Sequence, residues 1–165
     1  MRILLTFLVL AVSTTASAAD RLVTRHSREV GFVVRVPADW RYRNASYPSD
    51  HSTELWTSPA DTASRLKVEV SGCVGCVEPR SCVLENTGCR PAPENIVPAR
   101  AFSTQKLDRW RVRYVARTKS SRYLERGLVS ILHRGSDIRG FALARVWVPT
   151  AKARLGDAIL TSFKL

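Results

Sequence analysis

Arg109–Arg117, with the sequence RWRVRYVAR, is the segment whose pattern decides the fold. Apolar and basic residues alternate along it, and side chains two residues apart point to the same face of a strand. We therefore predict a strand with one buried face and one basic face. The apolar side has Trp110, Val112, Tyr114 and Ala116, and the basic side has Arg109, Arg111, Arg113 and Arg117.

Two long apolar runs follow, Tyr123–His133 and Ile138–Val148, joined by a polar turn. Both are apolar on both faces, which is typical of strands inside a sheet or beneath a helix. With the preceding strand they predict a three-stranded antiparallel meander. A helix is predicted at Ala151–Phe163, with Thr150 as its N-cap. The residues expected to pack on the sheet are Leu155, Ala158, Ile159, Ser162 and Phe163.

The first half of the chain also has the character of a sheet. Strands are predicted at Glu29–Pro37, Thr53–Thr57, Arg65–Ser71 and Arg100–Lys106, and Arg43–Ser52 is predicted to be a loop. The expected fold class is therefore α+β. It comprises an antiparallel sheet of about six or seven strands, with the C-terminal helix packed on one face.

Both ends of this predicted domain resemble the PsbP-like family. The resemblance lies in Phe32-x-Val34-x-Val36-Pro37-x-x-Trp40 near the start and Ile159-Leu160-x-Ser162-Phe163 at the end. The family includes an oxygen-evolving photosystem subunit and many small bacterial envelope proteins. It has no shared catalytic residues, so the resemblance implies an antiparallel sheet with packed helices and a role in binding or assembly.

The chain departs from that family after its third predicted strand, where such proteins commonly have a helix. The segment Ser71–Pro91, SGCVGCVEPRSCVLENTGCRP, holds all four cysteines, and its glycines and prolines exclude regular structure through most of it. Four clustered cysteines in an exported protein predict disulfides, and three pairings are possible. We favour the nested pairs Cys73–Cys89 and Cys76–Cys82, with Cys73–Cys76 and Cys82–Cys89 as the alternative.

Export is predicted from residues 1–18. Met1-Arg2 is followed by an apolar run, Ile3–Val12, and by small residues that end in Ala16-Ser17-Ala18. These are the three parts of a secretory signal peptide, and the apolar run is shorter than the roughly 20 residues of a membrane span. We expect cleavage between Ala18 and Ala19, a periplasmic or secreted location, and a single domain at 19–165.

The charge balance points to an acidic partner. The formal net charge is +12, and 21 of the 26 basic residues are arginine, whose planar fork suits carboxylates and phosphates. A solvated arginine face that pairs with local acids gives the same pattern. Nucleic acid is disfavoured, because Trp110 and Tyr114 alternate away from the arginines. The candidate partner-binding residues are Arg80, Arg90, Arg109, Arg111, Arg113 and Arg117.

Catalytic motifs are not found. The sequence has no glycine-rich phosphate loop, no nucleophile elbow and no histidines in metal-ligand spacing, so we expect no enzymatic activity, metal or cofactor. Cys73-Val74-Gly75-Cys76 has redox spacing, but no helix follows it to lower a thiol pKa. An oxidising compartment also competes with zinc for the thiolates.

These observations predict an exported protein that binds a protein partner without catalysis. It would act as an inhibitor or immunity protein against an envelope-targeting hydrolase, or as an accessory in envelope assembly. One alternative is a thiol–disulfide oxidoreductase that uses Cys73 and Cys76. Another is an electrostatic binder of anionic lipid or lipopolysaccharide.

Overall fold

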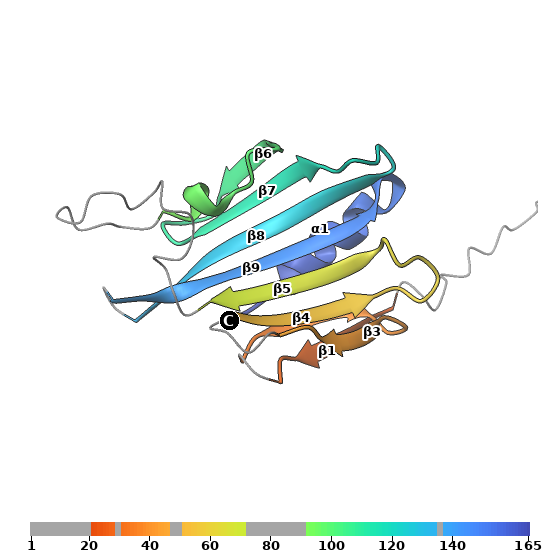
Figure 1. Cartoon of the computed structure of the whole chain (residues 1–165), viewed down its shortest axis with the longest axis horizontal. Coiled ribbons are helices and arrows are strands. Elements are labelled where there is room, and N and C mark those ends of the chain that lie inside the picture. The colour runs from red at the N-terminus through yellow and green to blue at the C-terminus, as the bar shows by residue number, and fades with distance from the viewer. Residues whose placement is uncertain (1–20, 29–30, 47–50, 72–91, 135–136) are drawn as a thin grey trace, which may run out of the picture.

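The computed structural model describes residues 21–28, 31–46, 51–71, 92–134 and 137–165, which form two antiparallel sheets and one α-helix (Figure 1). The strands are β1 (Leu22–His26), β2 (Val33–Pro37), β3 (Arg41–Asn44), β4 (His51–Thr57), β5 (Arg65–Ser71), β6 (Ala101–Lys106), β7 (Arg111–Arg117), β8 (Tyr123–Arg134) and β9 (Asp137–Pro149). The helix is α1 (Ala153–Ser162), and two 3-10 turns are η2 (Pro93–Ile96) and η3 (Thr150–Lys152).

The main sheet has seven strands in the order β3-β4-β5-β9-β8-β7-β6, and β1 pairs with β2 in a separate hairpin. Every pairing is antiparallel. The predicted meander is confirmed as β7-β8-β9. Strands β8 and β9 are interior, as expected for segments that are apolar on both faces.

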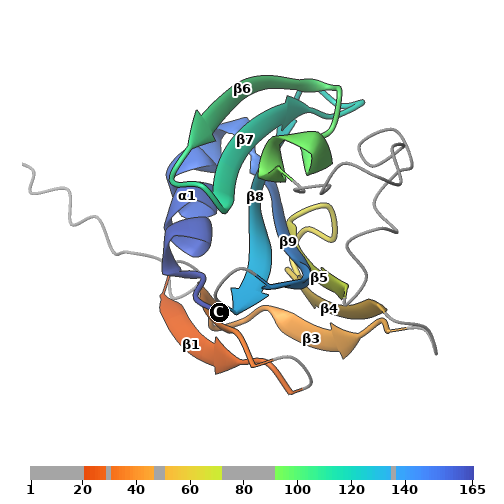
Figure 2. The same ribbon diagram turned by 90° about the vertical axis from the view of Figure 1, so that its left-hand side faces the viewer.

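One face of the sheet, here called the helix face, is covered by α1 and the β1–β2 hairpin (Figure 2). The main core lies beneath them. In this core the ring of Phe32 packs against Trp56, with centroids 6.0 Å apart, and against Phe163, with centroids 5.2 Å apart. The chain ends of the domain meet at this point, because Val33 and Lys164 exchange backbone hydrogen bonds of 2.8 and 2.9 Å. The two segments that carry the PsbP-like resemblance are therefore neighbours in space.

The opposite face, here called the distal face, carries η2 over β7 and β8. A smaller apolar cluster lies beneath η2, with Tyr114, Ala116 and Val129 buried and Ile96 and Leu143 packed against them. The sheet is curved, and η2 lies on the side turned away from α1 (Figure 2).

Three features of the N-terminal half differ from the prediction. A strand at Leu22–His26 was not expected, and the predicted loop Arg43–Ser52 contains the end of β3 and the start of β4. The strand predicted from Glu29 begins only at Val33, after Gly31 with φ +80°. Strands β1 and β3 lie at sheet edges, where most side chains are exposed, so they lack the apolar alternation by which strands are recognised.

Two details of the helix were also wrong. Thr150 does not cap α1, because its hydroxyl donates to the carbonyl of Arg122 at 3.2 Å and Lys152 occupies the N-cap position. Ala158 is exposed and Leu155 and Ser162 are only half-buried, whereas Ile159 and Phe163 are buried as predicted, together with Gly156 and Leu160. The face of α1 that packs also includes Gly156, which approaches the sheet closely: a Cβ there would lie 3.1 Å from Arg126 Cδ and from Val148 Cγ2.

The predicted leader, residues 1–18, and the four cysteines lie outside the described residues. In the part of the chain that is described, no helix is long and apolar enough to cross a membrane.

Candidate binding pocket on the distal face

Alternation in β5 puts charged side chains on the distal face. Leu66 and Val68 are buried in the core on the helix face, so Arg65, Lys67 and Glu69 project the other way. The antiparallel register then sets Lys67 opposite Arg145 of β9, and Arg65 opposite Trp147. Because every second residue of β5 is apolar and faces the core, the three ionisable residues between them all lie on the distal face.

Glu69 is the centre of one ionic cluster. Lys67 Nζ lies 2.5 Å from Glu69 Oε1, and Arg145 Nη2 donates to Glu69 Oε2. The Glu69 side chain is 26% exposed, so this carboxylate serves two cations at the edge of solvent. Its negative charge is therefore already neutralised within the fold.

Two guanidinium groups lie over the Trp147 side chain. Arg65 Cζ is 4.5 Å from the centroid of a Trp147 ring, and Arg145 Cζ is 5.4 Å from it. Cations at this distance over an indole face are held by the ring quadrupole. Arg65 is therefore positioned without a carboxylate, and its hydrogen-bond donors stay available to a ligand.

A second cluster surrounds Glu125, whose side chain is 1% exposed. Tyr114 Oη donates to Glu125 Oε1 at 2.8 Å, and Arg100 Nη2 donates to Glu125 Oε2 at 2.5 Å. Burial and the charge of Glu125 raise the pKa of Tyr114 above its ordinary value, and the hydrogen bond to Glu125 raises the pKa of Arg100. This cluster is internally satisfied and supports the surface beside Trp147.

Gly127 makes room for that cluster. A Cβ on Gly127 would lie 2.1 Å from Tyr114 Cε1 and Cζ, so the tyrosine ring can lie across β8 only because residue 127 has no side chain. Tyr114 and Gly127 are register partners of β7 and β8.

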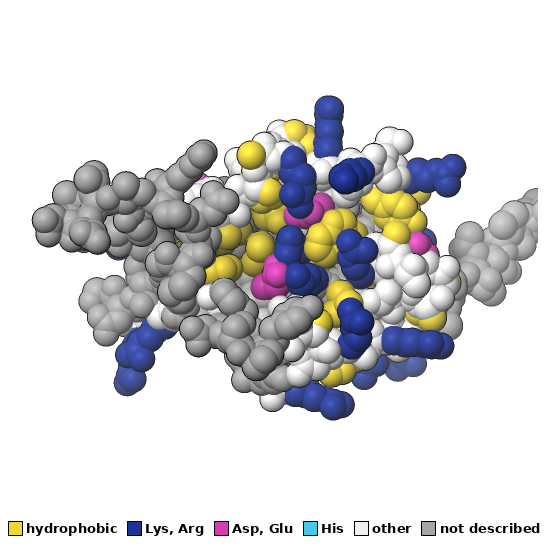
Figure 3. All heavy atoms as spheres, in the orientation of Figure 1, with side chains coloured by type: hydrophobic (Ala, Val, Ile, Leu, Met, Phe, Trp, Pro, Cys, Tyr) yellow, Lys and Arg dark blue, Asp and Glu magenta, His cyan; other side chains and the backbone are white. Residues whose placement is uncertain are grey.

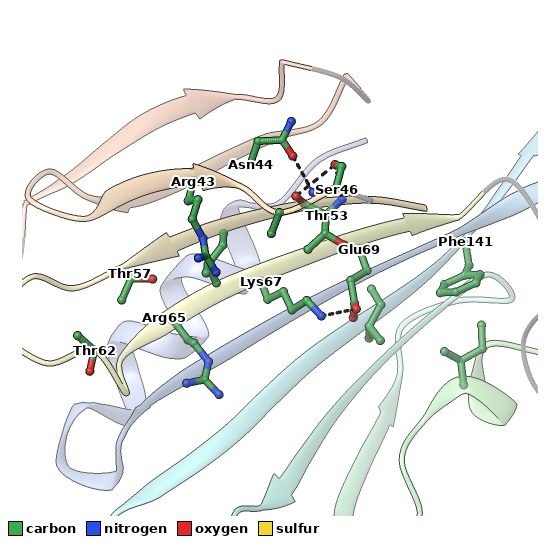
Figure 4. Close-up of a pocket in the computed structure, with 14 residues that line it drawn as sticks. Arg43, Asn44, Ser46, Thr53, Thr57, Thr62, Arg65, Lys67, Glu69 and Phe141 are labelled. Carbon is green, nitrogen blue, oxygen red and sulfur yellow. Dashed lines mark hydrogen bonds and ion pairs between the residues drawn. The ribbon is translucent and has the colours of Figure 1, made fainter. Parts of the chain in front are cut away.

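A pocket of about 1080 Å³ opens on the distal face over β3, β4, β5 and β9 (Figure 4). Arg43 and Arg65 lie toward one end of it, Lys67 lies near the middle beside Glu69, and Phe141 lies at the other end (Figure 4). Hydroxyl and amide groups of the lining lie on β3, β4 and the turns beside them. These polar residues are Asn44, Ser46, Thr53, Thr57 and Thr62.

The apolar end is formed by Phe141, Leu143 and Ile96. Phe141 pairs with Ser71, and Arg65 with Trp147, so the two ends are six strand positions apart, roughly 20 Å. The chain enters the cysteine-containing segment after Ser71, beside this apolar end.

The pocket carries an excess of positive charge. Three cations line it against one carboxylate, Glu69, which already pairs with Lys67 and with Arg145. Among the described residues, Arg43 and Arg65 have no carboxylate within 4.0 Å. Figure 3 views this face and shows Lys and Arg side chains spread across its centre, with acidic groups among them. Chemically, the pocket suits an anion with an apolar extension.

No cluster of three or more His, Cys, Asp or Glu side chains that could hold a metal ion occurs among the described residues.

The structure places Arg111, Arg113 and Arg117 of the predicted strand on the helix face, opposite the pocket. Arg113 Nη2 donates to Thr161 Oγ1 of α1 at 3.2 Å, and Arg111 forms an ion pair with Asp108 at 2.7 Å. Arg117 lies over the Phe102 ring. Arg109 precedes β7 and lies over the Trp110 ring. These four side chains are therefore engaged separately and do not form one continuous row.

Two other candidate residues, Arg80 and Arg90, lie outside the described residues, as do Cys73, Cys76, Cys82 and Cys89. Arg145 of β9 lies on the distal face and binds Glu69, and Arg100 binds the buried Glu125 from the segment that precedes β6.

Sequence reasoning missed the pocket arginines. The alternation in Arg65–Ser71 puts the apolar Leu66 and Val68 on one face of a strand, so the charged residues between them, Arg65 and Lys67, could have been read as a charged surface. Arg43 gave no such signal, because its short edge strand resembles a loop in sequence.

The curved antiparallel sheet, with a C-terminal helix on one face that meets the start of the domain, has the PsbP-like fold that the sequence predicted. A similar solved structure is the solution structure of cyanobacterial PsbP (CyanoP) from Synechocystis sp. PCC 6803. The match covers 95% of this chain and 98% of that chain, with a TM-score of 0.52 and 12% sequence identity. At this identity the likeness concerns the fold. Neither a protein-family model nor a curated protein sequence matches the chain.

Proposed function

We propose that this chain is an exported binding protein whose distal-face pocket receives an acidic region of a protein partner. The observation that carries the proposal is the pair of pocket arginines, Arg43 and Arg65, which face a large open pocket without a carboxylate partner among the described residues. Arginine binds carboxylates through two parallel hydrogen bonds, which gives orientation as well as affinity.

The remaining lining supports a macromolecular partner. A volume of about 1080 Å³ is larger than one carboxylate needs, and hydroxyl groups of Thr53, Thr57 and Thr62 offer donors and acceptors to a peptide backbone. Phe141 adds an apolar contact at the far end. Polar rims with an apolar anchor are typical of protein–protein interfaces.

The PsbP-like fold is compatible with such a role, because function on a fold is decided by its surface sites. We propose that the partner is a cell-envelope hydrolase that this protein inhibits, or an envelope component that it helps to assemble. In either version the pocket orients the partner, and the cysteine-containing segment, which begins beside the Phe141 end, makes an adjoining contact.

The test compares variants that lose the same charge at different places. The mature protein (19–165), Arg43→Gln/Arg65→Gln and the control Arg35→Gln/Arg154→Gln are immobilised and exposed to periplasmic extract. Arg35 and Arg154 are exposed residues that do not line this pocket. The captured partner is identified by mass spectrometry and its affinity is measured with purified proteins at two salt concentrations.

We expect the pocket variant to bind at least about 100-fold more weakly, because two charge-assisted contacts are lost, while the control stays within about threefold. Equal affinity of the wild type and the pocket variant would remove the pocket from this function.

The apolar end of the pocket favours one second candidate, an anionic amphiphile such as a lipid. Its headgroup would bind Arg43 and Arg65, and its chain would lie on Phe141 and Leu143. Vesicles that contain phosphatidylglycerol distinguish it from the first proposal. Binding to these vesicles that is lost with added salt and in the pocket variant, and is absent for phosphatidylcholine, would favour the amphiphile.

The oxidoreductase alternative depends on Cys73 and Cys76 and is tested separately. Thiol titration of the native protein and an insulin-reduction assay would detect a reactive dithiol. We expect neither free thiols nor reductase activity.

A further inference from the structure

A second pocket lies on the helix face, on the other side of the sheet from the distal-face pocket. It has a volume of about 280 Å³ and is bounded by β6, β7, β8 and the flank of α1. Its polar lining consists of Ser103, Gln105, Arg113, Arg126 and Asp157. Helix α1 packs on β8 and β9, which leaves this space beside it over β7.

We propose that this pocket is a binding site for a small oxyanion, a phosphate or carboxylate group, held between Arg113 and Arg126. The site is independent of the distal-face pocket and of the function proposed for it.

The register brings the two arginines together. Arg113 of β7 pairs with Leu128 of β8, so Arg126, two positions earlier on β8, is its diagonal neighbour on the same face. Diagonal neighbours of an antiparallel pair lie roughly 7–8 Å apart, within reach of long side chains. Two positive charges are therefore placed side by side next to a helix.

Their hydrogen bonds are incomplete. Arg126 is 8% exposed; its Nε donates to Asp157 Oδ1 at 2.9 Å, but its buried Nη1 has no partner. Arg113 Nη2 donates to Thr161 Oγ1 at 3.2 Å, and its buried Nε has no partner. Buried donors on a charged group are costly to leave unsatisfied, so a pair of them beside a pocket indicates a missing acceptor.

The local charges point the same way. Asp157 is the one carboxylate that lines this pocket, and its side chain is 61% exposed, so it neutralises only part of the charge of the two guanidinium groups. An oxyanion would supply both the missing charge and the missing acceptors. Ser103 and Gln105 lie on β6 beside Arg113 and Val115 and can contribute neutral donors.

The size of the pocket limits the ligand. About 280 Å³ accommodates a phosphate, a sulfate or a terminal carboxylate with a few attached atoms, and it is below the usual range for drug-sized ligands. The probes are therefore inorganic phosphate, sulfate and acetate, each compared with chloride at matched ionic strength. Phosphate and sulfate report a tetrahedral ligand group, and acetate reports a carboxylate.

The experiment uses the mature protein and follows the arginine Nε–Hε signals by ¹⁵N NMR during titration. We expect saturable shifts confined to the signals of Arg113 and Arg126. Arg113→Gln should weaken binding at least about tenfold, because one charge-assisted contact is lost. Arg154→Gln removes the same charge from an exposed position of α1 and should change the affinity by less than about twofold.

A second variant tests the sign of the charge argument. Asp157→Asn removes the competing carboxylate and should tighten anion binding several fold, because one unit of negative charge near the ligand is lost. A merely structural Arg126–Asp157 pair predicts no such gain. Shifts spread over all surface arginines, equal affinity of Arg113→Gln and the wild type, or no tightening in Asp157→Asn would each overturn the proposal.

Discussion

Glu125 lies buried under the distal face, where Tyr114 and Arg100 supply the hydrogen bonds of both its oxygens. A buried carboxylate gains little net stability from such a pair, but removing one donor leaves an uncompensated buried acceptor. The cluster around Glu125 therefore fixes the positions of neighbouring side chains. Tyr114 is fixed across Gly127, and the surface beside Trp147 is supported from below.

Tyr114→Phe tests this cluster. The variant keeps the ring and loses the hydroxyl that binds Glu125, so we expect the free energy of unfolding to fall by about 1–3 kcal/mol. Urea denaturation of the mature protein measures the change. Tyr123→Phe is the matched control, because its hydroxyl binds the half-buried Asp61 at 2.9 Å and should cost less. Equal losses in the two variants would contradict the role assigned to Glu125.

Asp61 provides a prediction about pH. Hydrogen bonds, above all from the Ser64 hydroxyl, lower the pKa of Asp61 below its ordinary value of 3.8. A lowered pKa in the folded state gives stability that is present above pH 3.8 and is lost as the pH falls through the folded pKa.

Asp61→Asn should therefore be less stable than the wild type at pH 7, by about 0.5–1 kcal/mol because the site is partly solvated. The difference should shrink only as the pH falls below 3.8 and through the lowered pKa of the folded Asp61 carboxyl, where the wild-type side chain takes up a proton. Thermal unfolding between pH 2 and pH 7 checks both statements. A difference that stays constant over this range would show that ionisation of Asp61 is not involved.

At the scale of elements, the strands follow from the alternation of apolar and polar residues, and the packing of α1 follows from the close approach of Gly156 to the sheet. The predicted strand Arg109–Arg117 is found as β7, and Val112, Tyr114 and Ala116 are buried as its pattern indicated. Glycine is a poor helix former, so by helix propensity alone Gly156 is a weak point of α1. The structure shows that it lets α1 approach Arg126 and Val148.

Gly156→Val tests that close approach. Helix propensity alone predicts a small gain, because glycine is the poorer helix former. We expect instead a loss of about 1–3 kcal/mol, since a Cβ would already lie 3.1 Å from Arg126 Cδ and Val148 Cγ2. Ala158→Val, at an exposed position of the same helix, is the control and should cost less than about 1 kcal/mol. Stabilisation by Gly156→Val would refute the packing argument.

At the scale of the whole molecule, the two faces of one sheet are put to different uses. The helix face holds the main core, together with the small pocket at Arg113 and Arg126. The distal face holds the large pocket with Arg43 and Arg65. Our proposals place one anion-binding pocket on each face of the sheet, which predicts that phosphate and the acidic partner do not compete.

The cysteines make a prediction at the same scale. They lie in the sequence between β5 and η2, and we expect the nested pairs Cys73–Cys89 and Cys76–Cys82 after export. Closing a loop of this length should stabilise the fold by roughly 3 kcal/mol, so reduction should lower the free energy of unfolding by about that amount. Peptide mapping without reduction determines the pairing. Alkylation of four thiols in the unreduced mature protein would show that no disulfide forms.

The sequence by itself determined the antiparallel meander, the single C-terminal helix and the PsbP-like layout. These depend on periodicity, and periodicity is a local property of the chain: Val112 and Tyr114 must share a face wherever β7 lies. Tertiary structure alone decided which face each strand turns toward α1. It set Arg145 against Glu69 and Arg113 against Thr161, and it left Arg43 and Arg65 at a pocket. Register and helix placement are fixed by contacts between residues far apart in sequence, and alternation within one strand carries no information about them.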